Sequence, residues 1–392
     1  MKKILYISYD GLLEPLGQSQ VLEYQKELSQ SYDIFIISYE KTNLDINNKH
    51  HNATLNSIKS SNIKWFRLKY HKKPSGLATA VDIFTGIFYA SFLILRFNIK
   101  IIHARSYVPS VIAIAMKKLM KIKFIFDMRG FWADERVDGG IWKNHSFLYK
   151  LAKWFESKFI INADHIVSLT KSAINEIKKF KYIDSNLPPY SVISTCTNLK
   201  MFAYKPNKNK NFTLGYVGSV GTWYDFDAVV VAFLELLKII PDSTLYIVNQ
   251  NEHEYIKNKL LKNNISMNCY NLVSANHSEV PSLMNQMDAG VFFINQVFSK
   301  TASAPTKLGE FLGCGIPCLT NNKIGDMQLI IEKENVGVSI HDFSKANIKA
   351  GIQDLINITQ TTNISKKCVR ASNKYFSLND GVKKYDQIYS SL

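Results

Sequence analysis

The chain has 392 residues, 46% of them hydrophobic, and a formal net charge of +16. This length is typical of two domains, and the hydrophobic share is enough for an ordinary core in each. The five cysteines are odd in number and scattered, so their spacing excludes a disulfide framework and a paired zinc site and favours a reducing cytoplasm.

The positive charge is concentrated in the first half. Residues 1–200 hold 29 Lys and Arg against 16 Asp and Glu, a net charge of +13, whereas the remainder has +3. Such a half, with clusters such as Lys117, Lys118, Lys121 and Lys123, suits an anionic membrane leaflet or a phosphate-bearing acceptor. Nucleic acid would fit the charge, but no nucleic-acid-binding motif is recognised, so no such partner is expected. The alternative that these lysines are solvated surface stays open.

The first half alternates between strand-like and helix-like segments. The run 3–9 is short and apolar and ends in Tyr9-Asp10-Gly11, which indicates a first strand and its turn rather than a signal peptide. The predicted strands are 3–9, 33–39, 63–68, 101–104, 124–127, 165–169 and 191–194. The predicted helices are 18–31, 77–97 and 108–120, and 40–61 is predicted to be a polar loop. This alternation predicts an α/β domain with a parallel sheet.

The helix at 77–97 contains the longest apolar region of the chain. Asp82 interrupts it, and only 13 residues, 83–95, follow without a charge. A helix that spans a bilayer needs about 20 apolar residues. The segment is therefore expected to be a buried helix or a membrane-facing one.

The second half restarts the same pattern after a polar linker at 207–211. The predicted strands are 212–217, 243–248, 268–270, 289–294 and 316–320, and the predicted helices are 227–240 and 305–312. Residues 379–392 carry Val382, Tyr385, Ile388 and Tyr389 at helical spacing. The expected organisation is a domain over 1–200, a second domain over 201–378, and a terminal helix over 379–392.

The segment 303–317 is the most informative in the chain. Pro305 suits the start of a helix, and Leu308, Phe311 and Leu312 share one face of it. Thr306, Lys307 and Glu310 share the opposite face, beside free backbone N–H groups and the positive end of the helix dipole. This pattern predicts a phosphate site, with Glu310 accepting hydrogen bonds from ribose hydroxyls. The alternative is an ordinary surface helix.

A second loop of the same half would approach the phosphates. Gly218 and Gly221 follow the strand at 212–217 and let the backbone, including Ser219, approach a pyrophosphate closely. Asp225 and Asp227 resemble a manganese-binding carboxylate pair, but they stand at a predicted helix start. Aspartate is favoured there as a cap, and two carboxylates make a poor metal cage. No metal site is therefore expected.

Polar residues at strand ends mark a candidate site in the first half. Asp127 and Arg129 end the strand at 124–127, and His103 ends the one at 101–104. Such positions face the ligand crevice of open α/β sheets. Arg129 could stabilise a leaving diphosphate, with Asp127 beside it. A structural Asp127–Arg129 turn pair and a structural His103 are the alternatives.

The segment Pro305-Thr-Lys-Leu-Gly-Glu-Phe-Leu-Gly-Cys-Gly-Ile-Pro317 resembles the donor-site signature of glycosyltransferase family 4. The loop Pro15-Leu-Gly-Gln-Ser-Gln20 is similar to loops of bacterial surface-polysaccharide glycosyltransferases. The resemblance implies donor contacts by Gly218, Ser219, Pro305, Thr306, Lys307 and Glu310. It also implies catalytic roles for Asp127, Arg129 and Lys307. Gly17, Gln18, Ser19 and His103 are the implied contacts with the acceptor or the sugar.

The same resemblance implies a fold and an activity. The fold is GT-B, in which two Rossmann-like domains face each other across a cleft and the C-terminal helix returns to the N-terminal domain. The activity is metal-independent, retaining glycosyl transfer from a nucleotide-diphospho-sugar to a glycan or lipid-linked acceptor, with no cofactor. The implied setting is lipopolysaccharide or capsule assembly, in the cytoplasm and peripheral to the inner face of the plasma membrane. The alternatives are a sugar-nucleotide 2-epimerase of the same fold and a non-enzymatic basic protein that binds nucleic acid or lipid.

Overall fold

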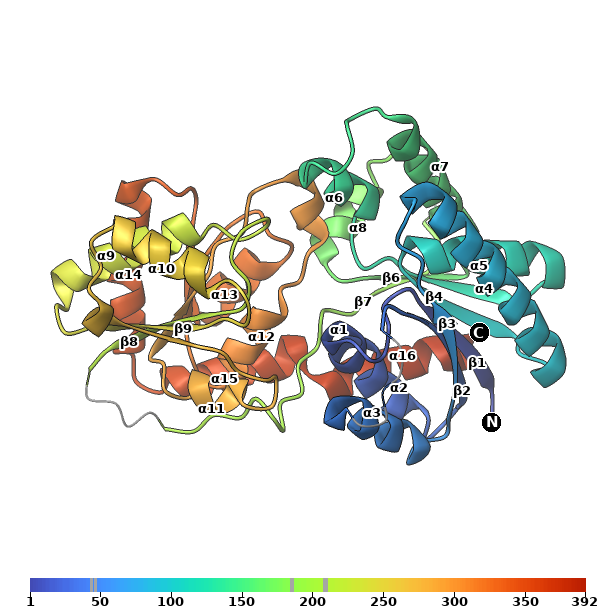
Figure 1. Ribbon diagram of the computed structural model, residues 1–392, viewed down its shortest axis with the longest axis horizontal. Coiled ribbons are helices and arrows are strands. Elements are labelled where there is room, and N and C mark those ends of the chain that lie inside the picture. The colour runs from blue at the N-terminus through green and yellow to red at the C-terminus, as the bar shows by residue number, and fades with distance from the viewer. Residues whose placement is uncertain (43–44, 46–47, 184–186, 207–210) are drawn as a thin grey trace. The chain divides into compact units, whose positions relative to one another are not determined.

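The computed structural model describes residues 1–42, 45, 48–183, 187–206 and 211–392, which form two compact units (Figure 1). Unit 1 comprises Met1–Ser194 and Asn379–Leu392, and unit 2 comprises Thr195–Leu378. Each unit is an α/β domain built on one parallel sheet, as the alternation of elements predicts.

The sheet of unit 1 has seven parallel strands in the order β3-β2-β1-β4-β5-β6-β7. They are β1 Lys3–Ser8, β2 Asp33–Glu40, β3 Ile63–Lys69, β4 Ile101–Arg105, β5 Lys123–Asp127, β6 His165–Ser168 and β7 Tyr190–Val192. Ser8 pairs with Arg105, and Arg105 pairs with Asp127, so these three strand ends form a row. The strand order reverses between β1 and β4, which is where open α/β sheets bind ligands.

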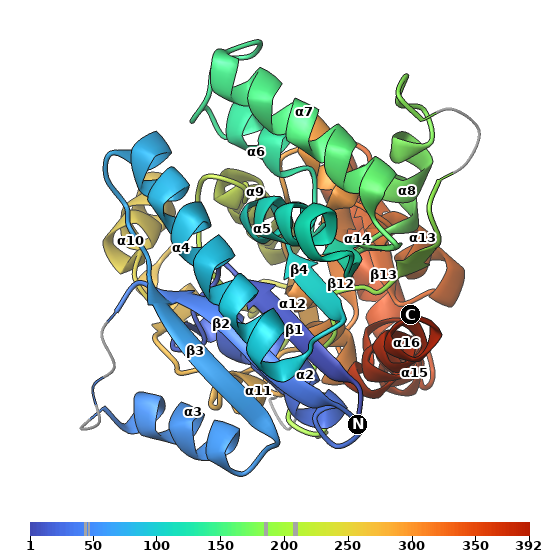
Figure 2. The same cartoon turned by 90° about the vertical axis from the view of Figure 1, so that its right-hand side faces the viewer.

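Helices cover both faces of this sheet. One group comprises α1 Pro15–Gly17, a π-helical turn Gln18–Leu22, α2 Glu23–Leu28, α3 Lys49–Lys59 and α16 Leu378–Ser391. The other comprises α4 Ser75–Phe97, α5 Tyr107–Met120 and α7 Phe147–Asn162, which lie in front of the sheet in Figure 2. Two shorter helices, α6 Trp132–Asp138 and α8 Lys171–Ile177, follow β5 and β6. As expected, the C-terminal helix packs on this unit, where the Tyr389 hydroxyl lies 2.6 Å from His103 Nδ1.

One side of the helix α4 is buried in unit 1, and the other side is exposed. Ala90 and Leu93 are buried, and Gly86 lies so close to α5 that an added Cβ would come within 2.4 Å of Ile112. The opposite side of α4 is open to solvent and apolar. By length and composition alone α4 could cross a membrane, and among the described residues no other helix meets that test.

The sheet of unit 2 has six parallel strands in the order β10-β9-β8-β11-β12-β13. They are β8 Thr213–Val217, β9 Thr244–Val248, β10 Tyr270–Val273, β11 Ala289–Val291, β12 Cys318–Asn321 and β13 Gly337–Ile340. The helices are α9 Phe226–Ile239, α10 His253–Lys262, α11 Val280–Met284, α12 Thr306–Gly313, α13 Met327–Glu334, α14 Lys345–Thr359 and α15 Ile364–Phe376.

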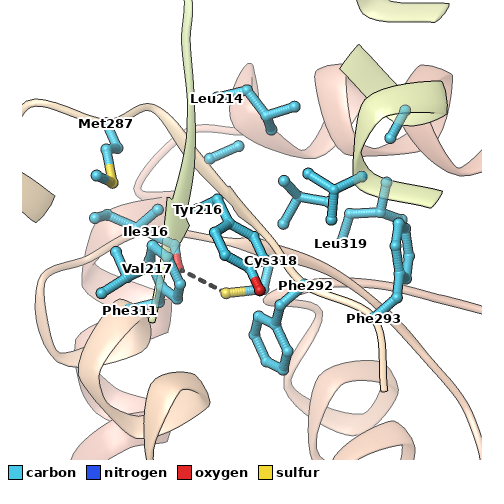
Figure 3. Packing of buried hydrophobic residues seen from close by; sticks show 14 of the residues in the cluster. Leu214, Tyr216, Val217, Met287, Phe292, Phe293, Phe311, Ile316, Cys318 and Leu319 are labelled. Atoms are coloured by element: carbon cyan, nitrogen blue, oxygen red, sulfur yellow. Dashed lines mark hydrogen bonds between the residues drawn. The ribbon is translucent and has the colours of Figure 1, made fainter. Parts of the chain in front are cut away.

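The core of unit 2 brings α12 close to the sheet. Phe311 of α12 stacks on Phe292 with ring centroids 6.3 Å apart, in a cluster that also includes Tyr216 (Figure 3). An added Cβ on Gly290 would come within 2.8 Å of the Phe311 ring, so glycine is required there for this approach. Because α12 lies against the strands, its first turn is held beside the loop that follows β8.

Two element predictions are wrong. The segment 40–61 is not a continuous loop, because α3 occupies Lys49–Lys59 and buries Thr54 and Ile58. The segment 268–270 is mainly a 3₁₀ turn, Met267–Cys269, and the strand begins only at Tyr270. Apart from Asn211, the predicted linker at 207–211 lies outside the described residues.

Candidate functional site

The helix α12 begins at Thr306, with Pro305 in extended conformation at its N-cap. Its predicted apolar face is confirmed, since Leu308, Phe311 and Leu312 are all buried. On another side of the helix, an added Cβ on Gly309 would come within 2.9 Å of Phe376 at the end of α15. Two buried sides fix α12, and its first turn keeps backbone N–H groups that the helix itself cannot satisfy.

Lys307 lies in an aromatic enclosure. Its Nζ is 3.5 Å from the centroid of the Tyr224 ring and 5.0 Å from that of the Tyr216 ring. An added Cβ on Gly218 would lie 2.8 Å from the same Nζ. The nitrogen is shielded from solvent, and no hydrogen-bond acceptor reaches it among the described residues. The structure thus brings Lys307 and Gly218 together, as the sequence predicts.

Burial shifts the pKa of Lys307 and of Glu310 in opposite directions. Desolvation lowers the pKa of Lys307 to about 7, although the carboxylates of Glu310 and Glu252 oppose this shift. Desolvation raises the pKa of Glu310 to about 7, against the attraction of Lys307. The two groups lie three residues apart on one helix, and each favours the charged form of the other without forming an ion pair.

The loop after β8 has a backbone that favours glycine. Gly218 and Gly221 adopt φ values of 115° and 84°, and Thr222 adopts 48°. Three hydrogen bonds hold the start of the loop: Gly218 N donates to Val248 O, Asn249 Nδ2 to Gly218 O, and the Tyr216 hydroxyl to Ser219 O. Ser219 itself is exposed. This rigid turn presents backbone at the position where the sequence predicts a pyrophosphate.

A second cation lies near this loop. Lys300 is buried, and its Nζ is 3.6 Å from the centroid of the Trp223 ring. Residues 219–224 of the loop itself contain neither arginine nor lysine. Lys300 and Lys307 approach the loop from elsewhere in the chain.

The carboxylates of Asp225 and Asp227 are engaged in contacts within unit 2. Asp225 caps α9, with its Oδ1 accepting from Ala228 N at 2.8 Å. Asp227 pairs with Lys259 of α10 at 2.7 Å. Across 1–42, 45, 48–183, 187–206 and 211–392, no group of three or more His, Cys, Asp or Glu side chains could hold a metal ion.

Asp127 and His103 lie in a buried network at the strand ends of unit 1. Asp127 Oδ2 is 3.3 Å from His103 Nε2 and accepts from the Tyr385 hydroxyl at 3.1 Å. His103 Nδ1 pairs with Tyr389, so both ring nitrogens are engaged. The side chains of His103 and Asp127 are 0% and 1% exposed. The helix α16 therefore covers two residues that the sequence predicts to contact substrate.

The charge state of this network follows from its neighbours. Burial would raise the pKa of Asp127, but Arg129, His103 and Arg105 together hold it below its usual value. Burial lowers the pKa of His103 despite the carboxylate beside it. The network thus favours an ionised Asp127 and a neutral His103 at pH 7.

Arg129 follows β5 in a constrained conformation. Its φ is 57°, and its Nη1 is 3.8 Å from Asp127 Oδ1. The side chain is 12% exposed, whereas Asp127 is enclosed. A non-glycine residue at positive φ is uncommon and stores strain, which proteins often place at functional sites.

The first loop of unit 1 is held by a residue that was not predicted. Glu40, at the end of β2, accepts from Leu12 N at 2.8 Å and from Leu13 N at 3.1 Å. An added Cβ on Gly17 would lie 1.9 Å from Gly11 O, so the loop folds tightly back on itself.

The side chains of two predicted contact residues of this loop form hydrogen bonds within unit 1. Gln18 Nε2 donates to Thr54 Oγ1 at 3.0 Å, and Ser19 Oγ donates to Pro15 O at 2.9 Å.

Two family models match the chain. Residues 21–197 match the model described as glycosyltransferase family 4, and residues 199–374 match the model described as glycosyl transferases group 1. The chain belongs to glycosyltransferase family 4. No curated protein matches it in sequence.

Solved structures show the same GT-B fold as this glycosyltransferase. Sucrose-phosphate synthase from Thermosynechococcus elongatus aligns with a TM-score of 0.74 at 12% identity, over 100% of this chain and 99% of that one. Anabaena HepE in complex with UDP and glucose aligns at 0.70 and 14% identity, over 100% of both chains. The lipopolysaccharide outer core galactosyltransferase WaaB, in its apo form, aligns at 0.66 and 14% identity, also over 100% of both. At these identities the likeness establishes the fold alone.

Sequence reasoning missed several residues that shape the site of this family 4 glycosyltransferase. Tyr216 and Tyr224 enclose Lys307, Glu40 holds the first loop, and Tyr385 and Tyr389 engage the strand ends. A glutamate at the end of an otherwise apolar strand was the one available signal, for Glu40. The tyrosines act across 80 or more residues of chain, where local spacing carries no information.

Proposed function

We propose that this enzyme transfers a hexosyl group from a nucleotide-diphospho-sugar to a glycan or lipid-linked acceptor, with retention and without a metal ion. Unit 2 binds the donor, and unit 1 binds the acceptor. The biological setting that we propose is bacterial surface polysaccharide assembly.

The observation that carries this proposal is the orphaned Lys307 ammonium. A buried cation without an acceptor costs free energy, and an anionic ligand beside it would remove that cost. Gly218 leaves space for backbone to approach such a ligand, and α12 begins one residue before Lys307. A diphosphate matches this arrangement, because it needs a cation, free N–H groups and close backbone together.

The remaining donor contacts follow from the same helix. Glu310 lies one turn beyond Lys307 and is placed to accept from ribose hydroxyls, while Pro305, Thr306 and Ser219 border the phosphates. HepE, which has the same fold, has been solved with UDP and glucose, and this supports a nucleotide-sugar donor here. Because Asp225 and Asp227 are engaged in a cap and an ion pair, the leaving diphosphate would be stabilised by Lys307 and helix N–H groups rather than by a metal.

In unit 1 we propose different roles for the predicted residues. Arg129, partly exposed at a strand end, contributes positive charge toward the leaving diphosphate. Asp127 and His103 are buried, so they act as positioning residues that hold Arg129 and the strand ends in place. The loop with Gly17, Gln18 and Ser19, fixed by Glu40, borders the acceptor.

We also propose a cytoplasmic location at the inner face of the plasma membrane. The excess of +13 in residues 1–200 favours an anionic leaflet, and the five scattered cysteines are compatible with a reducing compartment. The name of WaaB, a lipopolysaccharide outer core galactosyltransferase of the same fold, supports a surface glycan as product.

Turnover of a panel of nucleotide sugars tests the proposal. The enzyme is incubated with each donor, with and without lipid-linked or glycan acceptors and with or without chelator. The expected result is a free nucleoside diphosphate plus a new glycoside whose anomeric configuration, read by NMR, equals that of the donor. An epimerised donor without any glycoside, or no change in any donor, would contradict it.

A further inference from the structure

Most of the exposed side chains on the outer faces of α4 and α7 in unit 1 are large and apolar. On α4 the exposed residues recur at intervals of three or four, which places them on one side of the helix. They are Leu77, Val81, Phe84, Phe88, Phe92 and Leu95, and Phe84 and Phe88 are 72% and 70% exposed. On α7 the corresponding residues are Phe147, Leu151, Trp154 and Ile161. Together these ten residues form what we call the apolar face.

The two helices belong to one layer. Both pack against α5, which lies between them, and all three lie in front of the sheet in Figure 2. A right-handed crossover places the helices that follow β3, β4 and β5 on the same side of a parallel sheet. The apolar face is therefore a surface of unit 1 alone. Soluble proteins rarely leave so many large apolar side chains together in water unless something covers them.

The exposed charged side chains on α4, α5 and α7 are all cations. The three helices contain only two carboxylates, Asp82 and Glu156, and both are buried. Exposed cations border the face at its ends and between the helices: Lys72, Lys73, Arg96, Lys118, Lys150 and Lys158. Apolar side chains bordered by cations, on helices without exposed anions, match the acyl chains and headgroups of an anionic bilayer.

The fold excludes a spanning role for α4. Asp82 lies in its N-terminal third and binds the Tyr9 hydroxyl at 2.6 Å and His71 Nδ1 at 2.6 Å. The Tyr39 hydroxyl donates to Asp82 O, also at 2.6 Å. A helix tied in this way to β2 and to the segments after β1 and β3 cannot enter a bilayer lengthwise without breaking unit 1. It can only lie along the surface.

We propose that unit 1 lies on an anionic lipid bilayer with the apolar face inserted among the acyl chains and the bordering cations at the headgroups. This goes beyond attraction by net charge, because it assigns the contact to named side chains and requires insertion. Of the cluster Lys117–Lys123, Lys117 and Lys123 are already paired with Asp164 at 2.6 and 3.2 Å, so that cluster alone is a weaker anchor than its charge implies. The inference does not depend on which sugar is transferred.

Vesicles of phosphatidylcholine with about 30% phosphatidylglycerol test it, with pure phosphatidylcholine as reference. The variants are Phe84→Ser/Phe88→Ser on the apolar face and, as a matched control, Leu261→Ser/Met267→Ser, two residues of unit 2 that are 73% and 80% exposed. We expect the first pair to lower partitioning by at least about tenfold, since each phenylalanine loses its apolar burial, and the control pair to leave it unchanged. The circular dichroism spectrum and the thermal unfolding of each variant in solution check that it is folded.

Insertion has its own readout in Trp154. Brominated acyl chains should quench the fluorescence of Trp154, because bromine quenches only indoles within the bilayer. The Trp154→Phe variant should therefore show less quenching than wild type. Equal partitioning of wild type and Phe84→Ser/Phe88→Ser, or no quenching of Trp154, would overturn the proposal. So would a wild-type dimer in sedimentation that the double substitution converts to monomer, because the face would then be covered by a second copy.

Discussion

Lys307 and Glu310 lie about one turn apart on α12, and burial brings the pKa of each close to 7 from opposite sides. Glu252, Tyr216 and Tyr224 are the other titratable groups near the ammonium. A phosphate would give Lys307 the anionic partner that it lacks. Ribose hydroxyls would donate hydrogen bonds to the Glu310 carboxylate. Ligand binding and protonation are therefore coupled at these two residues.

Affinity for a nucleoside diphosphate should depend on pH as a bell with its maximum near pH 7. Below that pH Glu310 gains a proton and cannot accept from both ribose hydroxyls; above it Lys307 loses the proton that binds phosphate. Each limb should fall by up to about tenfold per pH unit. Calorimetric titration from pH 5.5 to 9 measures both limbs. Glu310→Gln should remove the acidic limb and Lys307→Arg the alkaline one, whereas bells of unchanged width in both variants would refute the assignment.

Replacing Lys307 by methionine should stabilise the ligand-free protein. The substitution removes a buried cation that has no acceptor among the described residues and keeps the apolar stem between Tyr216 and Tyr224. We expect a gain of about 1 kcal/mol in the free energy of unfolding at pH 7, which corresponds to a rise of roughly 2–4 °C in Tm. Added nucleotide should raise the Tm of wild type but not that of Lys307→Met. A variant less stable than wild type would show that the cation has a partner.

At the scale of elements, the first loop of unit 1 depends on close packing around Gly17. Gly17 has room for no side chain, since an added Cβ would lie 1.9 Å from Gly11 O, whereas Gly76 on α4 has nothing within 4 Å. Gly17→Ala should therefore destabilise unit 1 by about 2 kcal/mol or more, and Gly76→Ala should be neutral or stabilise it by up to about 1 kcal/mol. Thermal unfolding of both variants decides this. Equal Tm values would mean that the loop can open without cost.

The helix cap at Asp225 gives a second prediction at this scale. Removing its hydrogen bond to Ala228 N in Asp225→Ala should cost about 1 kcal/mol of stability. Transfer activity should survive both this substitution and excess chelator, because neither carboxylate is assigned to a metal. Activity that is lost in EDTA and restored by manganese would identify the pair as a metal site.

The elements could be predicted from sequence wherever local signals agree. The helix α12 follows from Pro305 and its apolar spacing, and the seven strands of unit 1 follow from short apolar runs between turns. In α3 the signals conflict, because its lysine, histidine and asparagine residues indicate a loop while only a few side chains such as Ile58 anchor it. The α3 helix therefore depends on tertiary packing, which the local sequence pattern does not show.

At the scale of the whole molecule, the sequence identified the fold and the polar residues of α12, but not their surroundings. Lys307 and Glu310 were expected on an open face, yet aromatic rings enclose the ammonium. Those rings come from the β8 strand and the loop after it, about 80 residues earlier. Asp127 and His103 were likewise expected at an open strand end, which α16 covers from the far end of the chain. Residue type was predictable from the pattern, whereas accessibility depends on distant segments.

The central claim is that unit 2 binds a nucleotide diphosphate through Lys307 and Glu310. The most direct measurement is calorimetric titration of wild type and Glu310→Ala with UDP, GDP, ADP and TDP. We predict that at least one of them binds wild type and binds the variant about 10–150-fold more weakly, equivalent to 1.5–3 kcal/mol for a charged hydrogen-bonding group, while the Tm of the free protein hardly changes. Failure of all four to bind wild type, or equal affinity for wild type and Glu310→Ala, would contradict the account.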